Sequence, residues 1–384
     1  MRIAADRAIP QWEEKFTDLG EVRPYDAMDL KPESIRDADV LIVRTVTRVD
    51  AALLDGSSVR TGIAASAGTD HIDRECLARR GIRFAHAAGC NANSVSEYVV
   101  TALHVMASRN GWNLGSKSLA VVGVGQVGSR VAKKARALGM RVLLCDPPLR
   151  DATGDPQYRD LDHVLGADIV TFHVPLADDG PYPTRHMVGG ALLRRLSPTQ
   201  CLINTSRGAV VDSRELKTAL REGRIGGAVL DVWEGEPRVD FSLLEMTGLG
   251  TPHIAGNSLD GKVRATAMAR EALCGFLGVP PGSRADADFH EPRLLRPEPG
   301  AGGQEAVLSV LLQAFDLLKE DAGLRALGNL PPAEAAGGFE RLRTRKPLRP
   351  EFCHFLVDPG ERNIHLSGTF EALGFRIPGA GRTD

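Results

Sequence analysis

Three segments of the sequence place polar side chains directly after short apolar runs. They are Asn204–Asp212, Asp231–Pro237 and Thr251–Gly256. Because ligands of parallel sheets bind at the carboxyl ends of the strands, we expect the three segments to meet at one edge of a sheet. Among their residues, Arg207 can clamp a carboxylate, His253 can accept a proton, and Glu236 can hold the imidazole and stabilise its charged form.

These three residue types are what the oxidation of a 2-hydroxy acid requires. The hydroxyl proton needs a base, the base needs a group that orients it, and the neighbouring carboxylate needs a cation. Each residue also has an ordinary structural explanation, since one histidine among ten is more often a core or surface residue than a base. Spacing alone therefore indicates this chemistry without establishing it.

A glycine-rich turn over 123–128 has the spacing G-x-G-x-x-G. An apolar run over 119–122 precedes it and helical spacing follows from Gln126 to Leu138. In that setting Gly123 permits the tight turn, Gly125 lets the backbone approach a pyrophosphate, and Gly128 allows close packing of the helix. The helix N-terminus favours an anion without a lysine. The turn predicts a dinucleotide site.

An acidic residue follows at the distance expected for a ribose contact. Asp146 ends the apolar run Arg141–Cys145, eighteen residues after Gly128, where its carboxylate would repel a 2′-phosphate. NAD is therefore expected rather than NADP, with nearby Arg150 read as a solvated loop residue. A mononucleotide P-loop is the alternative, but Gly115–Ser118 precedes the strand instead of opening a helix after it.

The elements that position these residues follow a regular rhythm of strands and helices. In the first ninety residues, apolar runs at 39–43, 62–67 and 82–87 alternate with helical spacing such as Ile72–Arg80. After a helix over Ser94–Ser108, strand-like runs end at Cys145, Phe172, Asn204 and Asp231, with helical segments such as Ser213–Glu222 between them. This pattern predicts an α/β fold with a doubly wound parallel sheet.

The last third of the sequence is expected to form a small α+β domain. A helix over Ser258–Leu277 should return the chain to the first unit, and Pro297–Gly303 has the composition of a linker. The elements expected after it are helices over Gln304–Glu320 and Pro332–Leu342 and strands over Phe352–Val357 and Asn363–Leu366. The predicted domains are 1–92 with 258–284, then 93–257, then 285–384.

Composition narrows the possible partners. A chain of 384 residues is longer than one hydrophobic core usually serves, so more than one domain is expected. Its content of 43% apolar and 25% charged residues is typical of globular proteins. A net charge of -2 means that the chain has no excess of positive charge with which to bind nucleic acid or anionic lipid. Without signal-peptide features or a membrane-spanning apolar stretch, a cytoplasmic location is expected. The six scattered cysteines, with no CxxC pair, are expected to be reduced, and no metal site is predicted.

The motifs together resemble the D-2-hydroxyacid dehydrogenase family. The resemblance rests on Ala67–Asp73, the glycine turn and the three polar segments, in order from about residue 36 to 280. It implies a Rossmann-like NAD-binding domain with a flavodoxin-like substrate lobe, and Arg207, Glu236 and His253 as the catalytic set. The cofactor-binding residues that it implies are Gly123, Gly125, Gln126, Val127, Gly128, Asp146, Pro175, Ser206, Asp231 and Gly256.

Further segments resemble one branch of this family. They are Val43–Val49, Gly89–Ala92, Leu144–Pro148, Asp179–Tyr182 and Val229–Pro237. This resemblance implies oxidation of 4-phospho-D-erythronate to 2-oxo-3-hydroxy-4-phosphobutanoate on the route to pyridoxal 5′-phosphate. It also implies a homodimer joined through the C-terminal domain. Phosphoglycerate or hydroxypyruvate as substrate is the nearest alternative, and a non-catalytic NAD-sensing module is a more distant one.

The resemblance also implies a substrate site formed by Arg44, Thr45, Ser66, Gly68 and Asn257. Arg44 follows an apolar run, where a phosphate contact and a structural salt bridge are both open, whereas Arg48 is read as a surface charge. The basic run Arg341–Arg349 is either solvated or a phosphate contact from a partner subunit. Asn257 departs from the branch, whose members usually have a tyrosine there, so the shape of the pocket is open at this position.

Overall fold

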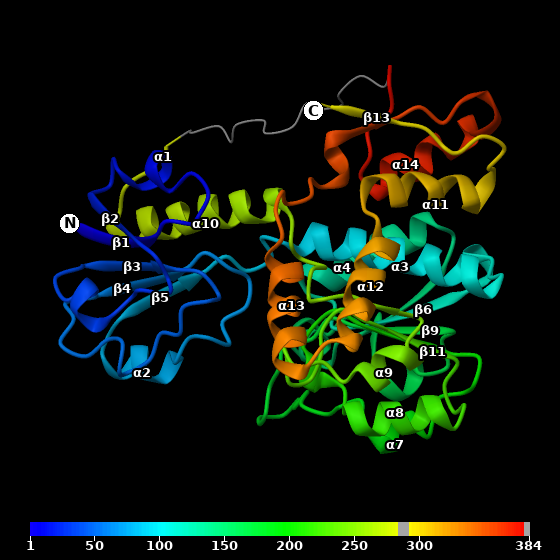
Figure 1. Ribbon diagram of the computed structural model, residues 1–384, viewed down its shortest axis with the longest axis horizontal. Helices are drawn as coiled ribbons and strands as arrows, with labels where there is room; N and C mark the ends of the chain where they lie inside the picture. Colours follow the sequence, from blue (N-terminus) through cyan, green and yellow to red (C-terminus); the bar gives the residue numbers. More distant parts are fainter. Residues whose placement is uncertain (283–291, 380–384) are drawn as a thin grey trace. The chain divides into compact units, whose positions relative to one another are not determined.

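The computed structural model describes residues 1–282 and 292–379 (Figure 1). They form two compact units, one of residues 1–91 and 258–282, the other of 92–257 and 292–379. Every strand pairing within the three sheets of the described residues is parallel, which confirms the predicted α/β class. The predicted boundary at 284–285 lies outside the described residues, and the three-domain division stays a prediction.

The first unit is built on a five-stranded sheet in the order β2-β1-β3-β4-β5. Its strands are β1 (Arg2–Asp6), β2 (Glu21–Tyr25), β3 (Val40–Val43), β4 (Thr61–Ala64) and β5 (Arg83–His86). This is the flavodoxin-like order that the resemblance implies. The apolar runs predicted β3, β4 and β5. They did not predict β2, which is an edge strand with exposed residues and can therefore accept Pro24.

Three helices accompany this sheet, α1 (Trp12–Phe16), α2 (Arg74–Arg79) and α10 (Leu259–Leu277), with a 3-10 turn η1 over Pro32–Ile35. The predicted return helix is confirmed: Ser258 caps α10 by accepting the N–H of Gly261 at 2.9 Å, and Gly278 ends it in the left-handed region. Leu273 of α10 packs in one core with Ile3 and Ile42.

The second unit is built on a seven-stranded sheet in the order β12-β11-β10-β9-β6-β7-β8. Its strands are β6 (Ser118–Val122), β7 (Arg141–Cys145), β8 (Tyr158–Arg159), β9 (Ile169–Phe172), β10 (Cys201–Asn204), β11 (Gly227–Leu230) and β12 (Leu249–Gly250). The strand order reverses beside β6, as in the doubly wound dinucleotide-binding fold. The predicted apolar runs coincide with β6, β7, β9, β10 and β11, most of whose residues are buried, whereas β8 and β12 were not predicted.

The helices up to residue 257 are α3 (Ala92–Asn110), α4 (Gln126–Ala137), α5 (Pro147–Thr153), α6 (Leu161–Val164), α7 (Gly190–Leu193), α8 (Ser213–Arg221) and α9 (Phe241–Met246). Short 3-10 helices are η2 (Leu114–Ser116) and η3 (Gly208–Val210). The first of the long helices, α3, is buried over most of its length, and it packs against α4 on one side and the C-terminal residues on the other (Figure 1). Among the helices of the described residues, none is long and apolar enough to cross a membrane.

The C-terminal residues pack as part of this unit. Their elements are β13 (Arg293–Leu295), α11 (Gly303–Ala314), α12 (Leu317–Ala326), η4 (Leu327–Asn329), α13 (Pro332–Thr344), η5 (Phe352–His354), β14 (Phe355–Val357), η6 (Glu361–Leu366) and α14 (Ser367–Leu373). The predicted strand over Phe352–Val357 is confirmed only for its second half, because residues 352–354 form η5. Two further predictions were wrong here. The helix over 304–320 is interrupted, because Phe315 is extended and Asp316 caps a new helix through the N–H of Lys319. The strand over 363–366 is the 3-10 helix η6, on which Ile364 is 62% exposed rather than directed into a core.

A buried ion pair ties the C-terminal chain to α3. The Glu97 carboxylate is fully buried and accepts hydrogen bonds from Arg349 Nη1 at 2.6 Å and from the N–H of Phe352 at 2.8 Å. Glu351 accepts from Ser94 Oγ at 2.6 Å and from Asn93 Nδ2 at 2.8 Å. Because buried charges are tolerated only when they are paired, this cluster fixes how the C-terminal chain meets α3.

Glu97→Ala is expected to lower the free energy of unfolding by about 3–5 kcal/mol, because it leaves the guanidinium of Arg349 buried and uncompensated. Urea unfolding followed by tryptophan fluorescence would measure this loss. Glu371→Ala, which removes an exposed carboxylate of α14, is the control and should change stability by less than about 0.5 kcal/mol. Equal losses in the two variants would contradict a stabilising role for the buried pair.

Candidate active site

The predicted catalytic and cofactor residues gather at the carboxyl edge of the seven-stranded sheet. The glycine turn follows β6, Asp146 follows β7, Arg207 follows β10, Glu236 lies beyond β11 and His253 follows β12. Adjacent strands of this parallel sheet therefore deliver all of these loops to one edge, where doubly wound folds bind ligands.

The geometry of the glycine turn fits a dinucleotide. Gly123 has a φ of +86°, and a Cβ there would lie 2.6 Å from the carbonyl oxygen of His173. A Cβ at Gly128 would lie 2.0 Å from the carbonyl oxygen of Gly123, so the helix packs too closely for any side chain. At Gly125, by contrast, no atom of the described residues lies within 4 Å of such a Cβ. The open space lies where a pyrophosphate would approach the start of α4.

Asp146 holds this turn in place. One carboxylate oxygen accepts the N–H of Val124 at 2.7 Å, and the other caps α5 through the N–H of Leu149 at 2.9 Å. The carboxylate thus lies beside the turn, where a ribose would follow the pyrophosphate. Arg150 is engaged by Asp151 at 3.1 Å and Asp160 at 2.5 Å rather than simply solvated, which disfavours it as a partner for a 2′-phosphate.

His253 and Glu236 form a hydrogen-bonded pair. His253 Nδ1 lies 2.7 Å from Glu236 Oε2, and Glu236 Oε1 accepts the N–H of Trp233 at 3.0 Å. Burial acts to raise the pKa of Glu236, but the hydrogen bond and charge of His253, with the Trp233 amide, hold that pKa below its usual value. An ionised carboxylate only accepts hydrogen bonds, so Nδ1 carries the proton and Nε2 remains the atom that can act as a base.

The backbone of His253 has a φ of +56°, a left-handed conformation that residues other than glycine rarely adopt. Its N–H donates to the carbonyl oxygens of Asp231 at 2.7 Å and Thr251 at 3.0 Å. The buried carboxyl group of Asp231 accepts the N–H groups of Ile254 at 2.8 Å and Ala255 at 2.9 Å. Burial raises the pKa of Asp231. Asp231 therefore organises the loop that carries the base, and its predicted cofactor contact stays a prediction.

The Arg207 loop is held against the Glu236 loop. Asn204 Oδ1 accepts the N–H of Ser206 at 3.0 Å, and Asn204 Nδ2 donates to the carbonyl oxygen of Arg207 at 2.9 Å. A Cβ at Gly208 would lie 2.1 Å from the backbone of Trp233, so the loops after β10 and β11 are in close contact. The structure thereby brings the loops of Arg207, Glu236 and His253 to adjacent strand ends.

Two positioning residues were missed by the sequence analysis. Trp233 Nε1 donates to the carbonyl oxygen of Thr251 at 2.9 Å, which links the loops after β11 and β12. The Tyr98 hydroxyl lies 2.6 Å from Thr251 Oγ1, which in turn donates to Asp231 at 2.7 Å. Trp233 stands inside a recognised motif and could have been found there. Tyr98 lies on α3, 153 residues before Thr251, and no local pattern indicates the contact.

In the first unit, the predicted substrate residues follow the carboxyl ends of β3 and β4. Arg44 Nε donates to the buried carboxylate of Asp6 at 2.8 Å, so the structural salt bridge is present while the side chain stays 28% exposed. Thr45 is exposed, and Ser66 Oγ donates to the carbonyl oxygen of Gly68 at 3.0 Å. Arg48 is exposed and pairs with Asp50 at 3.1 Å, as expected of a surface charge. Substrate contacts of these residues stay predictions.

Asn257 belongs to the second unit, and its side chain makes a contact that the sequence did not suggest. Asn257 Nδ2 donates to the carbonyl oxygen of Arg343, in the last turn of α13, at 2.8 Å. The residue therefore joins the His253 loop to the C-terminal helices, and its predicted substrate contact stays a prediction.

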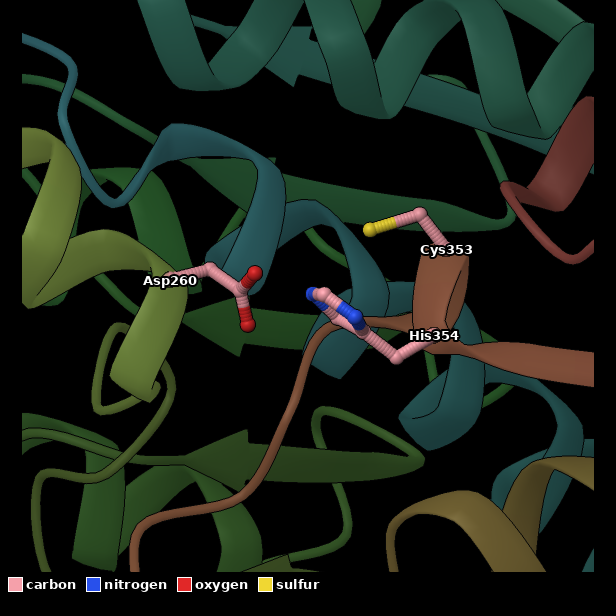
Figure 2. Close-up of side chains that lie close together, drawn as sticks. All are labelled: Asp260, Cys353 and His354. Carbon is pink, nitrogen blue, oxygen red and sulfur yellow. The ribbon is translucent and has the colours of Figure 1, made fainter. Parts of the chain in front are cut away.

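Figure 2 shows three side chains of types that bind metals, Asp260, Cys353 and His354. Cys353 and His354 are neighbours on η5 of the second unit, whereas Asp260 belongs to α10 of the first. Taken within its own unit, the pair falls short of the three or four protein ligands of a zinc site. No metal site is assigned, and all six cysteines are free thiols.

Comparison with known proteins agrees with this geometry. Residues 89–255 match the family model described as D-isomer specific 2-hydroxyacid dehydrogenase, NAD binding domain. The erythronate-4-phosphate dehydrogenase of Azotobacter vinelandii is 45% identical over 97% of this chain and 99% of its own length. That of Marinobacter nauticus is 40% identical over 98% of this chain and 100% of its own.

Among solved structures, the TT0316 protein from Thermus thermophilus is similar, with a TM-score of 0.61 and 28% identity over 74% of this chain and 99% of that one. These findings confirm the resemblance inferred from the motifs. The chain therefore belongs to the D-isomer specific 2-hydroxyacid dehydrogenase family, in its erythronate-4-phosphate dehydrogenase branch.

Proposed function

We propose that the protein oxidises 4-phospho-D-erythronate to 2-oxo-3-hydroxy-4-phosphobutanoate with NAD as the oxidant. The observation that carries this proposal is the 2.7 Å hydrogen bond between His253 and Glu236, at the same sheet edge as a glycine turn that fits a dinucleotide. The names of the full-length relatives support the choice of substrate. A place in the synthesis of pyridoxal 5′-phosphate follows from that choice.

His253 acts as the base. Nε2 accepts the proton of the substrate's 2-hydroxyl group as the C2 carbon is oxidised, while Nδ1 stays hydrogen-bonded to Glu236. The Glu236 carboxylate then lies against an imidazolium, and its negative charge stabilises that cation. Arg207 binds the substrate carboxylate through its planar guanidinium, which orients C2 relative to His253.

NAD would be held by the glycine turn and the loops beside it. Backbone N–H groups around Gly125, Gln126 and Val127 would bind the pyrophosphate, Asp146 would bind the ribose, and Pro175 and Ser206 would lie beside the cofactor. Asp231 and Gly256 would complete the nicotinamide end. When bound, NAD accepts the hydride that leaves C2 of the substrate.

The first unit is proposed to contribute Arg44 to the binding of the substrate's phosphate. Arg44 Nε donates to Asp6 at 2.8 Å, and the Arg44 side chain stays 28% exposed. Thr45, Ser66 and Gly68 follow the same two strand ends. A cytoplasmic homodimer is part of the same proposal, supported by apolar side chains such as Ile364 and Leu294 that are exposed in the C-terminal residues.

The substrate is tested by measuring NADH formation with 4-phospho-D-erythronate, 3-phosphoglycerate and D-lactate, with a 2-oxo acid present to reoxidise retained NADH. We expect kcat/KM to be highest for 4-phospho-D-erythronate, as the names of the full-length relatives suggest. It carries the phosphate that D-lactate lacks and has one more carbon between carboxylate and phosphate than 3-phosphoglycerate. Comparable rates with the other two acids and none with the first would reject the substrate while leaving the reaction class intact.

His253→Ala is expected to lower kcat by at least ~10²-fold, because the hydroxyl proton loses its acceptor. Steady-state kinetics with saturating NAD would measure the loss. His163→Ala, which removes an exposed histidine on α6, is the control and should retain the wild-type rate. A fully active His253→Ala variant would favour the non-catalytic NAD-sensing alternative.

Alanine substitutions at Gly125 and Gly128 form a matched pair of variants that tests the cofactor site. Gly125→Ala should fold normally, because its Cβ enters open space, but should weaken NAD binding about tenfold or more by filling the approach of the pyrophosphate. Gly128→Ala should instead lower stability by about 1–3 kcal/mol through overpacking. Thermal unfolding and NAD titration of both variants check this, and tight NAD binding by Gly125→Ala would argue against the assigned site.

A further inference from the structure

The carboxyl end of α13 is fastened to the loop that carries His253. Asn257 Nδ2 donates to the carbonyl oxygen of Arg343 at 2.8 Å, and the Asn257 N–H donates to the carbonyl oxygen of Ile254 at 2.8 Å. The last carbonyl groups of a helix lack partners within the helix, so the Asn257 amide satisfies one of them. Asn257 therefore connects the loop of the catalytic base to the last turn of α13.

Contacts along α12 and α13 also fix the position of α13 against the second unit. The N–H of Gly250 donates to Asp321 Oδ1 at 2.8 Å, which joins α12 to β12 directly before the His253 loop. Phe339 of α13 is buried in the same core as Trp233 and Leu244. In Figure 1, α12 and α13, drawn in orange, lie beside the sheet of the second unit and next to each other. The last turn of α13 is thus held in a fixed position beside the loop that carries His253.

Arg343 brings a positive charge to this edge. Its side chain is 31% exposed, and Nη1 lies 3.4 Å from Glu340 Oε1 on the preceding turn. Burial acts to raise the pKa of Glu236 and His253 acts to lower it, and the charge of Arg343 lowers that pKa further. Arg343 is therefore a half-buried cation at the helix end that Asn257 holds, whereas Arg341 on the same helix is exposed.

We propose that Arg343 is a specificity-determining residue, which binds the phosphate of the substrate from within the same chain. Asn257 is its positioning residue, because it holds the helix end from which Arg343 extends. The inference rests on the proposed function, which gives Arg207 the carboxylate and Arg44 one contact to the phosphate, so that this dianionic group still needs a second cation. A planar guanidinium can donate two parallel hydrogen bonds to a phosphate.

Arg343→Gln should raise KM for 4-phospho-D-erythronate by about 10- to 100-fold and change kcat little, because a charge-assisted contact is lost. With unphosphorylated D-erythronate, kcat/KM should equal that of the wild type. Asn257→Ala should shift KM for 4-phospho-D-erythronate in the same direction by a smaller factor. Arg341→Gln removes the same charge from the same helix and should leave both substrates unaffected.

Equal losses on the two acids, or a shifted pH profile of kcat with KM unchanged, would overturn the proposal, because Arg343 would then act only on the Glu236–His253 pair. Unchanged KM in Arg343→Gln would also overturn it. Thermal unfolding of each variant separates these effects from misfolding.

A calorimetric titration with inorganic phosphate tests the inference independently of turnover. Phosphate binding that is present in the wild type and lost in Arg343→Gln supports the anion site even if 4-phospho-D-erythronate proves not to be the substrate. If the wild type and Arg343→Gln bind phosphate equally, the site assignment fails even if the proposed substrate is correct.

Discussion

The loop after β12, which carries His253, depends on hydrogen bonds to the buried carboxyl group of Asp231. Removing a carboxylate from water is costly unless hydrogen bonds replace the lost solvation. Here the Thr251 hydroxyl and the N–H groups of Ile254 and Ala255 supply them, and all three donors belong to the loop after β12. Since Asp231 also fixes the His253 N–H through its carbonyl oxygen, the left-handed backbone of His253 is imposed by the surrounding hydrogen bonds rather than by its own preference.

The same loop reaches outward to the rest of the second unit. Tyr98 approaches it from α3, Trp233 from the loop after β11, and Arg343 from α13 through Asn257. The loop that carries His253 is therefore held by elements from three separate parts of the chain. Such support suits a general base, whose nitrogen must stay within hydrogen-bond reach of the proton that it accepts.

The C-terminal residues belong to this catalytic unit as well as being candidates for subunit contact. Glu97 and Arg349 fix them to α3 through a buried ion pair, and Asp321 fixes α12 to β12. Breaking a buried ion pair leaves an uncompensated charge, so these contacts hold the segment in one arrangement. The end of α13 that carries Arg343 is joined to the loop of His253 by the hydrogen bond from Asn257.

The sequence by itself determined the strands β6, β7, β9, β10 and β11, the glycine turn and the candidate roles of Arg207, Glu236 and His253. These features are local: a doubly buried strand is a continuous apolar run, and a motif lies within a few consecutive residues. Only the tertiary structure decided the loop-organising role of Asp231, the tether from Asn257 to α13, the edge strand β2 and the 3-10 helix over 361–366. Each of these depends on what a distant part of the chain places against the segment. A local sequence pattern indicates whether a residue is buried. The residue that it packs against is decided by the tertiary structure.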